Sequence, residues 1–210
     1  MIPLTQKIKK EKHKEIARAQ DLIIEELYRV FDKSIIHGGT AIWRCYQGNR
    51  FSEDIDAYIE NNKEKIEDLF KNFEKAGFVI LKKKITNNSI YSNLQFNRIN
   101  VRFEAIFTKK QSILKEYETY EGNFLTVYTL TPENLIKEKI NAYKDRLKIK
   151  DLYDIFFLLR HVKKRDEIIK EIKNFVQNFK EPIDKQEINV LIIHGLVPNT
   201  KEMIEYINNY

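Results

Sequence analysis

The sequence is poor in the residues that mark several classes of protein. Its 210 residues include one cysteine (Cys45), six glycines, four prolines and one tryptophan. A single cysteine excludes a disulfide within the chain and a cysteine-based zinc site, and it favours a reducing compartment, the cytoplasm. So few glycines and prolines exclude collagen-like and low-complexity chains.

Long apolar runs are also missing. The longest are about five residues, such as 155–159, whereas a membrane span needs about 18 or more. No apolar stretch follows the basic residues near the beginning, so neither a secretory signal nor contact with a membrane is expected. Hydrophobic residues nevertheless make up 42% of the chain and aromatic residues 12%. That is enough for a core, which excludes general disorder.

The charge balance is moderately positive. Lysine and arginine number 37 against 31 acidic residues, a formal net charge of +6. A moderately positive electrostatic field favours polyanionic partners such as nucleic acid or nucleotides. A lysine-rich solvated surface without any partner gives the same balance, so charge alone does not decide between these readings.

Hydrophobic periodicity predicts an α+β protein. Helices are expected over 5–31, 41–46 and 62–76, and strands over 34–36, 55–59, 78–85, 90–96, 99–107 and 125–130, in a mostly antiparallel sheet. After residue 130 the pattern becomes helical, with Thr131 as N-cap before Pro132 and further helices over 149–162, 167–179 and 201–207. We therefore expect a core of residues 1–130 that includes an N-terminal helix, and a helical region of residues 131–210 packed on it.

The most informative segment is HGGTAIWRCYQGNRFSEDIDAYI, residues 37–59. Gly38 and Gly39 allow a sharp turn and close approach to a ligand. Thr40 then starts a helix, whose free N–H groups suit a phosphate. Asp54 and Asp56 stand two residues apart on a predicted strand, so both carboxylates project from one face. Adjacent carboxylates repel unless a cation lies between them, and oxygen ligands suit Mg²⁺.

Four further charged residues lie in unusual positions. Glu104 is on the polar face of its strand, and it would be a third carboxylate if that strand lies beside the aspartate pair. Lys139 falls inside the apolar stripe of its helix, where an ammonium needs a partner or a ligand such as phosphate. Asp151 and Asp154 begin a nearly apolar helix, so at least one should be semi-buried and paired with Arg146 or Lys139.

A turn of Gly-Gly-Thr followed about thirteen residues later by Asp-x-Asp resembles the polymerase β-type nucleotidyltransferases. The fuller string GGTA…RFSEDID resembles the AbiEii / MenT-type nucleotidyltransferase toxins of type IV toxin–antitoxin and abortive-infection systems. The block TPENLIKEKINAYKDRLKIKDLYDIFFL, residues 131–158, is similar to a second element of that family. Two positions depart from it: His37 replaces a lysine or small residue, and Lys150 replaces a common arginine.

The resemblance implies a polymerase β-like core sheet flanked by helices, with a C-terminal helical bundle. It also implies Mg²⁺-dependent transfer of a nucleoside monophosphate from an NTP to RNA, such as a tRNA 3′ end, in a toxin with a cognate antitoxin. The residues it assigns to catalysis are Asp54, Asp56, Lys139 and Asp151; to the metal Asp54, Asp56 and Glu104; and to the nucleotide Gly38, Gly39, Thr40, Arg50, Ser52 and Lys139.

Simpler explanations stand beside each assignment. The glycines can form an ordinary turn, the aspartates can be solvated, and Glu104 can pair with Arg102 at the surface. Lys139 can lie at the edge of the apolar stripe of its helix with its ammonium in solvent. Asp151 can stabilise the beginning of its helix through its charge, and Arg50 and Ser52 can simply hold the loop before Asp54 in place. His161, His194 and the strand aromatics are expected to be structural, the aromatics as core and not as a base-stacking platform. Other functions that remain open are transfer to a small-molecule or protein hydroxyl, and an inactive nucleotide-binding relative.

Overall fold

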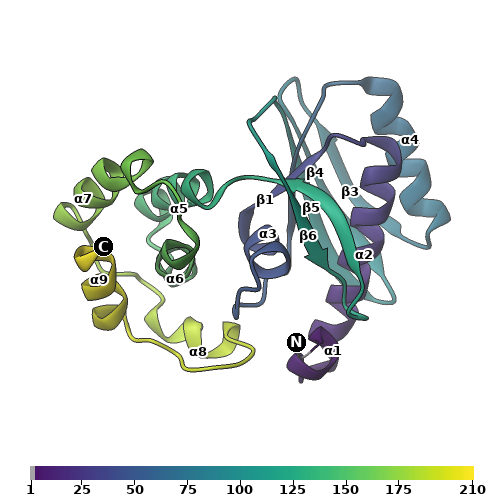
Figure 1. Ribbon diagram of the computed structural model, residues 1–210. Helices are drawn as coiled ribbons and strands as arrows, with labels where there is room; N and C mark the ends of the chain where they lie inside the picture. The colour runs from purple at the N-terminus through teal and green to yellow at the C-terminus, as the bar shows by residue number, and fades with distance from the viewer. Residues whose placement is uncertain (1–2) are drawn as a thin grey trace.

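A computed structural model describes residues 3–210 and contains one seven-stranded sheet (Figure 1). The strand order is β3-β4-β5-β2-β1-β7-β6. The strands are β1 (Ile35–His37), β2 (Ile55–Ile59), β3 (Val79–Ile85), β4 (Ser89–Phe96), β5 (Ile99–Phe107), β6 (Ile113–Glu118) and β7 (Phe124–Thr129). Neighbours are antiparallel except β1 with β7 and β2 with β5. The expected α+β class and mostly antiparallel sheet are confirmed.

Strand β6 was not predicted from the sequence. It lies at one edge of the sheet and pairs only with β7 among the described strands. Lys115 and Glu116 interrupt its apolar pattern, and only its last two residues are buried. Charged residues in a short edge strand protect it from pairing with other chains, and they also weaken the alternation by which strands are recognised.

Three helices of the N-terminal part pack against the sheet (Figure 1). Helix α2 (Glu11–Val30) contacts β5 and α4 (Lys63–Lys75), and α3 (Gly38–Cys45) lies beside β1, β2 and β6 and is joined to α2 by the ion pair between Arg44 and Asp21. The amphipathic helix expected over 62–76 is confirmed as α4, and Asn62 caps it by accepting a hydrogen bond from the Lys65 amide. The core therefore lies mainly between the sheet and the helices α2, α3 and α4.

The single helix expected over 5–31 is wrong, because the structure divides it into α1 (Leu4–Lys7) and α2. The break at Ile8 has an extended backbone, with φ −85° and ψ 114°. It allows both Leu4 and Ile8 to be buried, each 2% exposed. An uninterrupted helix would also bring the lysines at 7, 10 and 14 together at spacings of three and four residues, where like charges are unfavourable.

The chain after β7 is helical, as predicted. It contains α5 (Pro132–Arg146), α6 (Ile149–Leu158), α7 (Ile169–Gln177), α8 (Ile188–Leu191) and α9 (Thr200–Asn209). Short 3₁₀ turns occur at Leu159–His161, Arg165–Glu167 and Lys185–Glu187, so α6 and α7 are shorter than expected. Thr131 caps α5 by accepting from the Asn134 amide. No helix of residues 3–210 has the length and apolar character that a membrane crossing requires.

A late segment of this helical region holds the loop between α3 and β2. The Phe51 amide donates to the carbonyl of Leu191 at 2.8 Å, and the Ile193 amide donates to Asn49 at 2.8 Å. Arg50 forms a β-bridge with Ile192 between them. The loop that precedes Asp54 and Asp56 is therefore fixed by residues about 140 positions later in the chain.

Candidate active site

The turn from β1 into α3 lies directly beside Asp56. His37, the last residue of β1, is opposite Asp56 in the antiparallel register. Gly38 has a φ of +69°, and a Cβ at this position would overlap the Asp56 carboxylate. A Cβ on Gly39 would lie 2.6 Å from Ser52 Oγ. At either position a larger side chain would collide with Asp56 or Ser52. An ordinary turn therefore does not explain both glycines.

The three predicted carboxylates converge. Strands β2 and β5 run parallel and place Asp56 opposite Glu104, which confirms that this strand lies beside the aspartate pair. Arg102 forms ion pairs with Asp54 and with Glu104, the latter at 3.1 Å from Nε to Oε1. Asp56 makes no ion pair with any residue that the structure describes. The pairing of Glu104 with Arg102 that the sequence suggested is therefore present, and it lies beside Asp54 and Asp56.

A cavity of about 210 Å³ opens over these carboxylates, and its lining is almost entirely polar. Carboxylates and cations share it, together with the α3 turn. Its lining residues are Gly39, Arg50, Ser52, Asp54, Asp56, Arg102, Glu104, Lys139, Arg146 and Lys150. The structure therefore brings together most of the residues that the sequence singled out.

The donor set suits a hard divalent cation. Burial and the neighbouring charges of Asp56 and Asp54 raise the pKa of Glu104, and Arg102 opposes them. Within residues 3–210, no three acidic, histidine or cysteine side chains are already gathered closely enough to enclose a metal. The guanidinium of Arg102 supplies the positive charge that the carboxylates need. Mg²⁺ is commonly held by one or two carboxylates plus water and phosphate oxygens, so the residues present fit it.

Lys139 belongs to a buried network of ion pairs beneath the cavity. Its Nζ lies 2.8 Å from Asp154 Oδ2 and 3.4 Å from Asp151 Oδ1. Arg146 donates two hydrogen bonds to Asp151, at 2.7 and 2.8 Å, and Arg50 donates two to Asp154, both at 2.8 Å. Lys139 is only 7% exposed. The prediction that Arg146 or Lys139 pairs with these aspartates is confirmed. Lys139 does not lie at the edge of the apolar stripe of α5 with its ammonium in solvent.

The network keeps Asp154 ionised. Burial by itself would raise the pKa of Asp154, but the charges of Arg50 and Lys139 outweigh it and lower the pKa. Asp151 is equally buried. Neither aspartate is among the residues that line the cavity, whereas Lys139, Arg50 and Arg146 are. The aspartates therefore orient these cations toward the cavity without reaching it themselves.

The hydroxyl of Thr40 is already used within the protein. It donates to the backbone carbonyl of Asp54, and it accepts at 3.4 Å from Gln20 Nε2. Gln20 also donates to the Ser52 carbonyl at 2.8 Å. Thr40 therefore links the turn to the aspartate loop, and its backbone amide is the group that remains for a ligand. The sequence did not identify Gln20, because no pattern around a single glutamine in a long helix indicates its hydrogen-bond partners.

His37 takes part in a second contact that the sequence did not reveal. Its Nδ1 lies 3.1 Å from Glu138 Oε2, and its ring stacks on Tyr58 with the centroids 3.9 Å apart. Tyr58 donates a hydrogen bond to the other oxygen of Glu138. Burial opposes ionisation of Glu138, but His37 and Tyr58 lower its pKa. Helix α5 is thus tied to β1 and β2 by the residue next to Lys139.

His161 and most strand aromatics pack against neighbouring side chains, whereas His194 is exposed and its structural role stays a prediction. His161 packs edge-on against Tyr46, with the ring centroids 5.6 Å apart, and many strand aromatics, such as Phe103 and Tyr117, are fully buried. Tyr91 contradicts the expectation that strand aromatics are core. It is only half-buried, and its register partner is Glu104, which places it on the face that carries the carboxylates. A period-2 pattern does not indicate which face of a strand the rest of the fold will cover.

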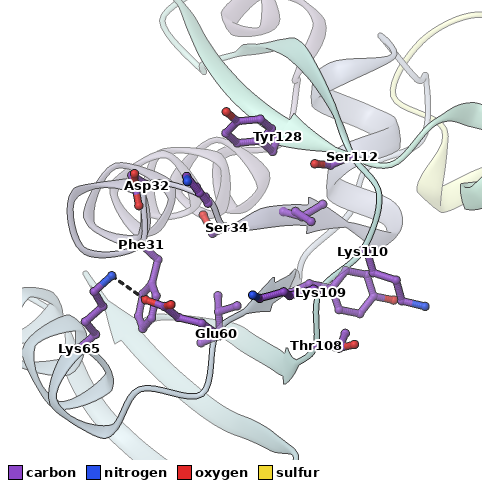
Figure 2. A pocket seen from close by; sticks show the side chains of 14 residues that line it. Phe31, Asp32, Ser34, Glu60, Lys65, Thr108, Lys109, Lys110, Ser112 and Tyr128 are labelled. Carbon is purple, nitrogen blue, oxygen red and sulfur yellow. Dashed lines mark hydrogen bonds and ion pairs between the residues drawn. The ribbon is translucent and has the colours of Figure 1, made fainter.

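A second cavity, of about 590 Å³, lies at the other end of β1 and β2 (Figure 2). Phe31, Tyr58, Tyr128 and Lys110 are among its lining residues, and an ion pair of 2.6 Å joins Lys65 and Glu60 across one side. None of the predicted site residues lines it. Its greater volume therefore does not make it the candidate site, because the chemistry lies in the smaller cavity.

Comparison with known proteins gives one family and a shared fold. Residues 26–196 match the model of the family described as nucleotidyl transferase AbiEii toxin, type IV TA system. The structure of JHP933 from Helicobacter pylori is similar, with a TM-score of 0.66 and 17% identity over 95% of this chain and 90% of that one. MenT4, a nucleotidyltransferase toxin from Mycobacterium tuberculosis, has a TM-score of 0.65 and 16% identity over 92% and 80%. No curated protein matches.

Proposed function

Because the chain belongs to the AbiEii family of nucleotidyltransferase toxins of type IV toxin–antitoxin systems, we propose that it transfers a nucleoside monophosphate from an NTP to RNA, with Mg²⁺ and release of pyrophosphate. A tRNA 3′ end is the proposed acceptor, a cognate antitoxin the proposed protein partner, and the cytoplasm the proposed site of action. The observation that carries the proposal is the convergence of Asp54, Asp56 and Glu104 on one cavity with the glycine turn.

The cavity offers a place for the triphosphate on the side of α3. Free amides and the helix dipole at Gly38, Gly39 and Thr40 attract phosphate oxygens. Arg50, Lys139, Arg146 and Lys150 also line the cavity. Burial, followed by repulsion from Arg146 and Arg50, lowers the pKa of Lys150. An anion bound here would relieve that repulsion, and fixed cations would stabilise charge that develops on the leaving pyrophosphate.

The metal would be held by Asp54, Asp56 and Glu104. When bound, Mg²⁺ would neutralise phosphate charge and polarise the reacting phosphoryl group. Arg102 must leave at least one of these carboxylates, because its guanidinium occupies oxygens of Asp54 and Glu104. Ser52 and Arg50 face the same cavity from the loop. Asp151 and Asp154 act as positioning residues that aim Lys139 toward the phosphates.

Removing the guanidinium of Arg102 should strengthen metal binding. The side chains of Arg102 and Glu104 are 44% and 38% exposed, and ion pairs of this kind are worth about 0.2–1 kcal/mol. Arg102→Gln is therefore expected to raise the affinity for Mn²⁺ or Mg²⁺ about twofold to fivefold, measured by calorimetry without nucleotide. Arg98→Gln, an exposed arginine in the β4–β5 turn, makes the same charge change and serves as control. Equal metal affinities of both variants would contradict this account.

Adding one methyl group at Gly38 should disturb the site much more than the fold. Gly38→Ala places a Cβ against the Asp56 carboxylate, and misplacement by about 1 Å can cost roughly a hundredfold in rate. Gly77→Ala is the matched control, because Gly77 also has a positive φ, +96°, but its nearest neighbour is Phe96 at 3.5 Å. We expect similar losses of stability and a loss of transfer in Gly38→Ala alone. Equal transfer rates would show that Asp56 does not need its present position.

The reaction itself can be tested with purified protein, Mg²⁺, each α-labelled NTP in turn and total tRNA. Asp56→Ala is assayed alongside. We expect one or more NTPs to label RNA with the wild type only. Labelling of protein or of a small molecule instead would support one of the other acceptor classes. NTP binding without transfer to any acceptor would favour an inactive nucleotide-binding relative, and absence of both NTP binding and transfer would contradict the enzymatic proposal.

A further inference from the structure

We propose that the open face of β3, β4 and β5 is the surface on which the single-stranded 3′ end of the RNA acceptor lies. The inference rests on the function proposed above and assigns a location to its acceptor. We call this surface the acceptor face, and it comprises Lys82 and Lys84 of β3, Tyr91 and Asn93 of β4, and Arg102 of β5.

The acceptor face is continuous with the catalytic carboxylates through the register of the sheet. One row of paired residues runs from Lys84 through Tyr91 and Glu104 to Asp56. The neighbouring row joins Lys82, Asn93 and Arg102, and Arg102 contacts Asp54. Since strands lie about 4.8 Å apart, three steps place Lys84 on the order of 14 Å from Asp56 along the backbone.

The other side of these strands is covered, which fixes the direction in which the acceptor face points. Helices α2 and α4 lie against that side (Figure 1). Lys83 pairs with Glu67 of α4 at 3.2 Å, and its Nζ lies 4.3 Å from the centroid of the Phe70 ring. Because side chains alternate along a strand, Lys82 and Lys84 must point away from α4. Both are exposed.

The side chains of the acceptor face match the parts of a nucleotide chain. Lys82, Lys84 and Arg102 are cations that suit phosphates, and the acidic residues of the two rows, Glu104 and Asp56, lie at the catalytic end. Lys82 Nζ lies 5.1 Å from the centroid of the half-buried Tyr91 ring. An aromatic ring beside a cation is the arrangement on which single-stranded bases stack while a phosphate is held nearby. Asn93, which lies between Lys82 and Arg102 in its row, supplies a side-chain amide.

The topology separates the acceptor from the NTP. In the strand order, β2 with Asp56 lies between β1 and β5. The phosphate-binding turn leads from β1 into α3, whereas Glu104 and the acceptor face extend from β5 toward β3. A triphosphate seated on the turn leaves the β5 side free, so the attacking hydroxyl arrives over Glu104. Lys82 and Lys84, which do not line the cavity, then hold the RNA without competing for the triphosphate.

The test uses two variants with equal net charge. Lys82→Glu/Lys84→Glu alters the acceptor face, and Lys71→Glu/Lys75→Glu alters two exposed lysines of α4 on the covered side. The probe is a fluorescent single-stranded RNA of about twelve nucleotides with a free 3′ hydroxyl, within the site sizes of such surfaces. Binding is titrated without NTP at several salt concentrations. NTP binding and melting temperature are measured on each variant, and Tyr91→Ala is included.

We expect the acceptor-face variant to bind RNA at least about tenfold more weakly than the α4 variant, and its salt slope to be shallower by roughly 1.4 because two phosphate contacts are lost. Tyr91→Ala should weaken binding about tenfold, within the range for one stacked base. NTP affinity should not change. Equal RNA affinities of the two charge variants, or a wild type that binds no RNA, would overturn the inference. RNA labelling by the wild type decides the proposed function separately.

Discussion

Replacement of Asp56 by asparagine is expected to lower nucleotidyl transfer at least about a thousandfold, because it removes several kcal/mol of metal-mediated charge stabilisation. Asparagine keeps the shape of the side chain and removes its charge. Asp56 makes no ion pair among the described residues, so its charge is not needed to hold neighbouring elements together. Steady-state transfer of α-labelled NMP, with a thermal melt of each protein, provides the measurement.

Asp68→Asn is the matched control for this prediction. Asp68 is an exposed residue of α4 that pairs with Lys71, and it lies on the covered side of the sheet. The two variants should melt at similar temperatures, and only Asp56→Asn should lose activity together with metal affinity. A transfer rate within tenfold of the wild type would mean that Asp56 does not hold the metal.

Replacement of Asp154 by alanine is expected to lower the free energy of unfolding by about 3–5 kcal/mol, because it leaves buried charges unpaired. Arg50 is 5% exposed and Lys139 is 7% exposed, and each directs hydrogen-bonding groups at this carboxylate. Asp68→Ala breaks an exposed pair and should cost less than about 1 kcal/mol. Urea unfolding of both variants makes the comparison. Similar losses would show that the network does not hold the helical region against the core loop.

The same carboxylate predicts a pH dependence. The charges of Arg50 and Lys139 outweigh burial and lower the pKa of Asp154 below its ordinary value. Its contribution to stability is therefore complete above the unfolded pKa of about 3.9 and is lost as the pH falls through the lower folded pKa. Between pH 5 and pH 3, the gap in unfolding free energy between wild type and Asp154→Ala should begin to narrow. A gap that widens on acidification would contradict an ionised Asp154.

The sequence predicted the local part of the site well. The spacing of two residues between Asp54 and Asp56 fixes a shared face, and the glycine pair before a helix fixes a turn, whatever the rest of the fold does. The position of Glu104 required one further assumption, that β5 lies beside β2, and the register confirms it. Lys139 was noticeable because a charge inside an apolar stripe needs a partner.

Contacts between distant segments could not be predicted. Arg50 and Asp154 are 104 residues apart, and Glu138 reaches His37 across 101 residues. Neither arginine nor glutamate is unusual in its local sequence, so nothing marked them as partners. The exposed position of Tyr91 likewise depends on which face α2 and α4 cover. The division into a core of residues 1–130 and a helical region of residues 131–210 stays a prediction, although the Arg50–Asp154 pair crosses it.

The central claim is that the chain transfers a nucleoside monophosphate to RNA and releases pyrophosphate. The most direct measurement incubates wild-type protein, Mg²⁺ and total tRNA with the same NTP carrying label at either the α or the γ phosphate. The account predicts that α label becomes covalently attached to RNA while γ label appears only in pyrophosphate. Attachment of γ label to RNA, or free inorganic phosphate as the main product, would contradict it.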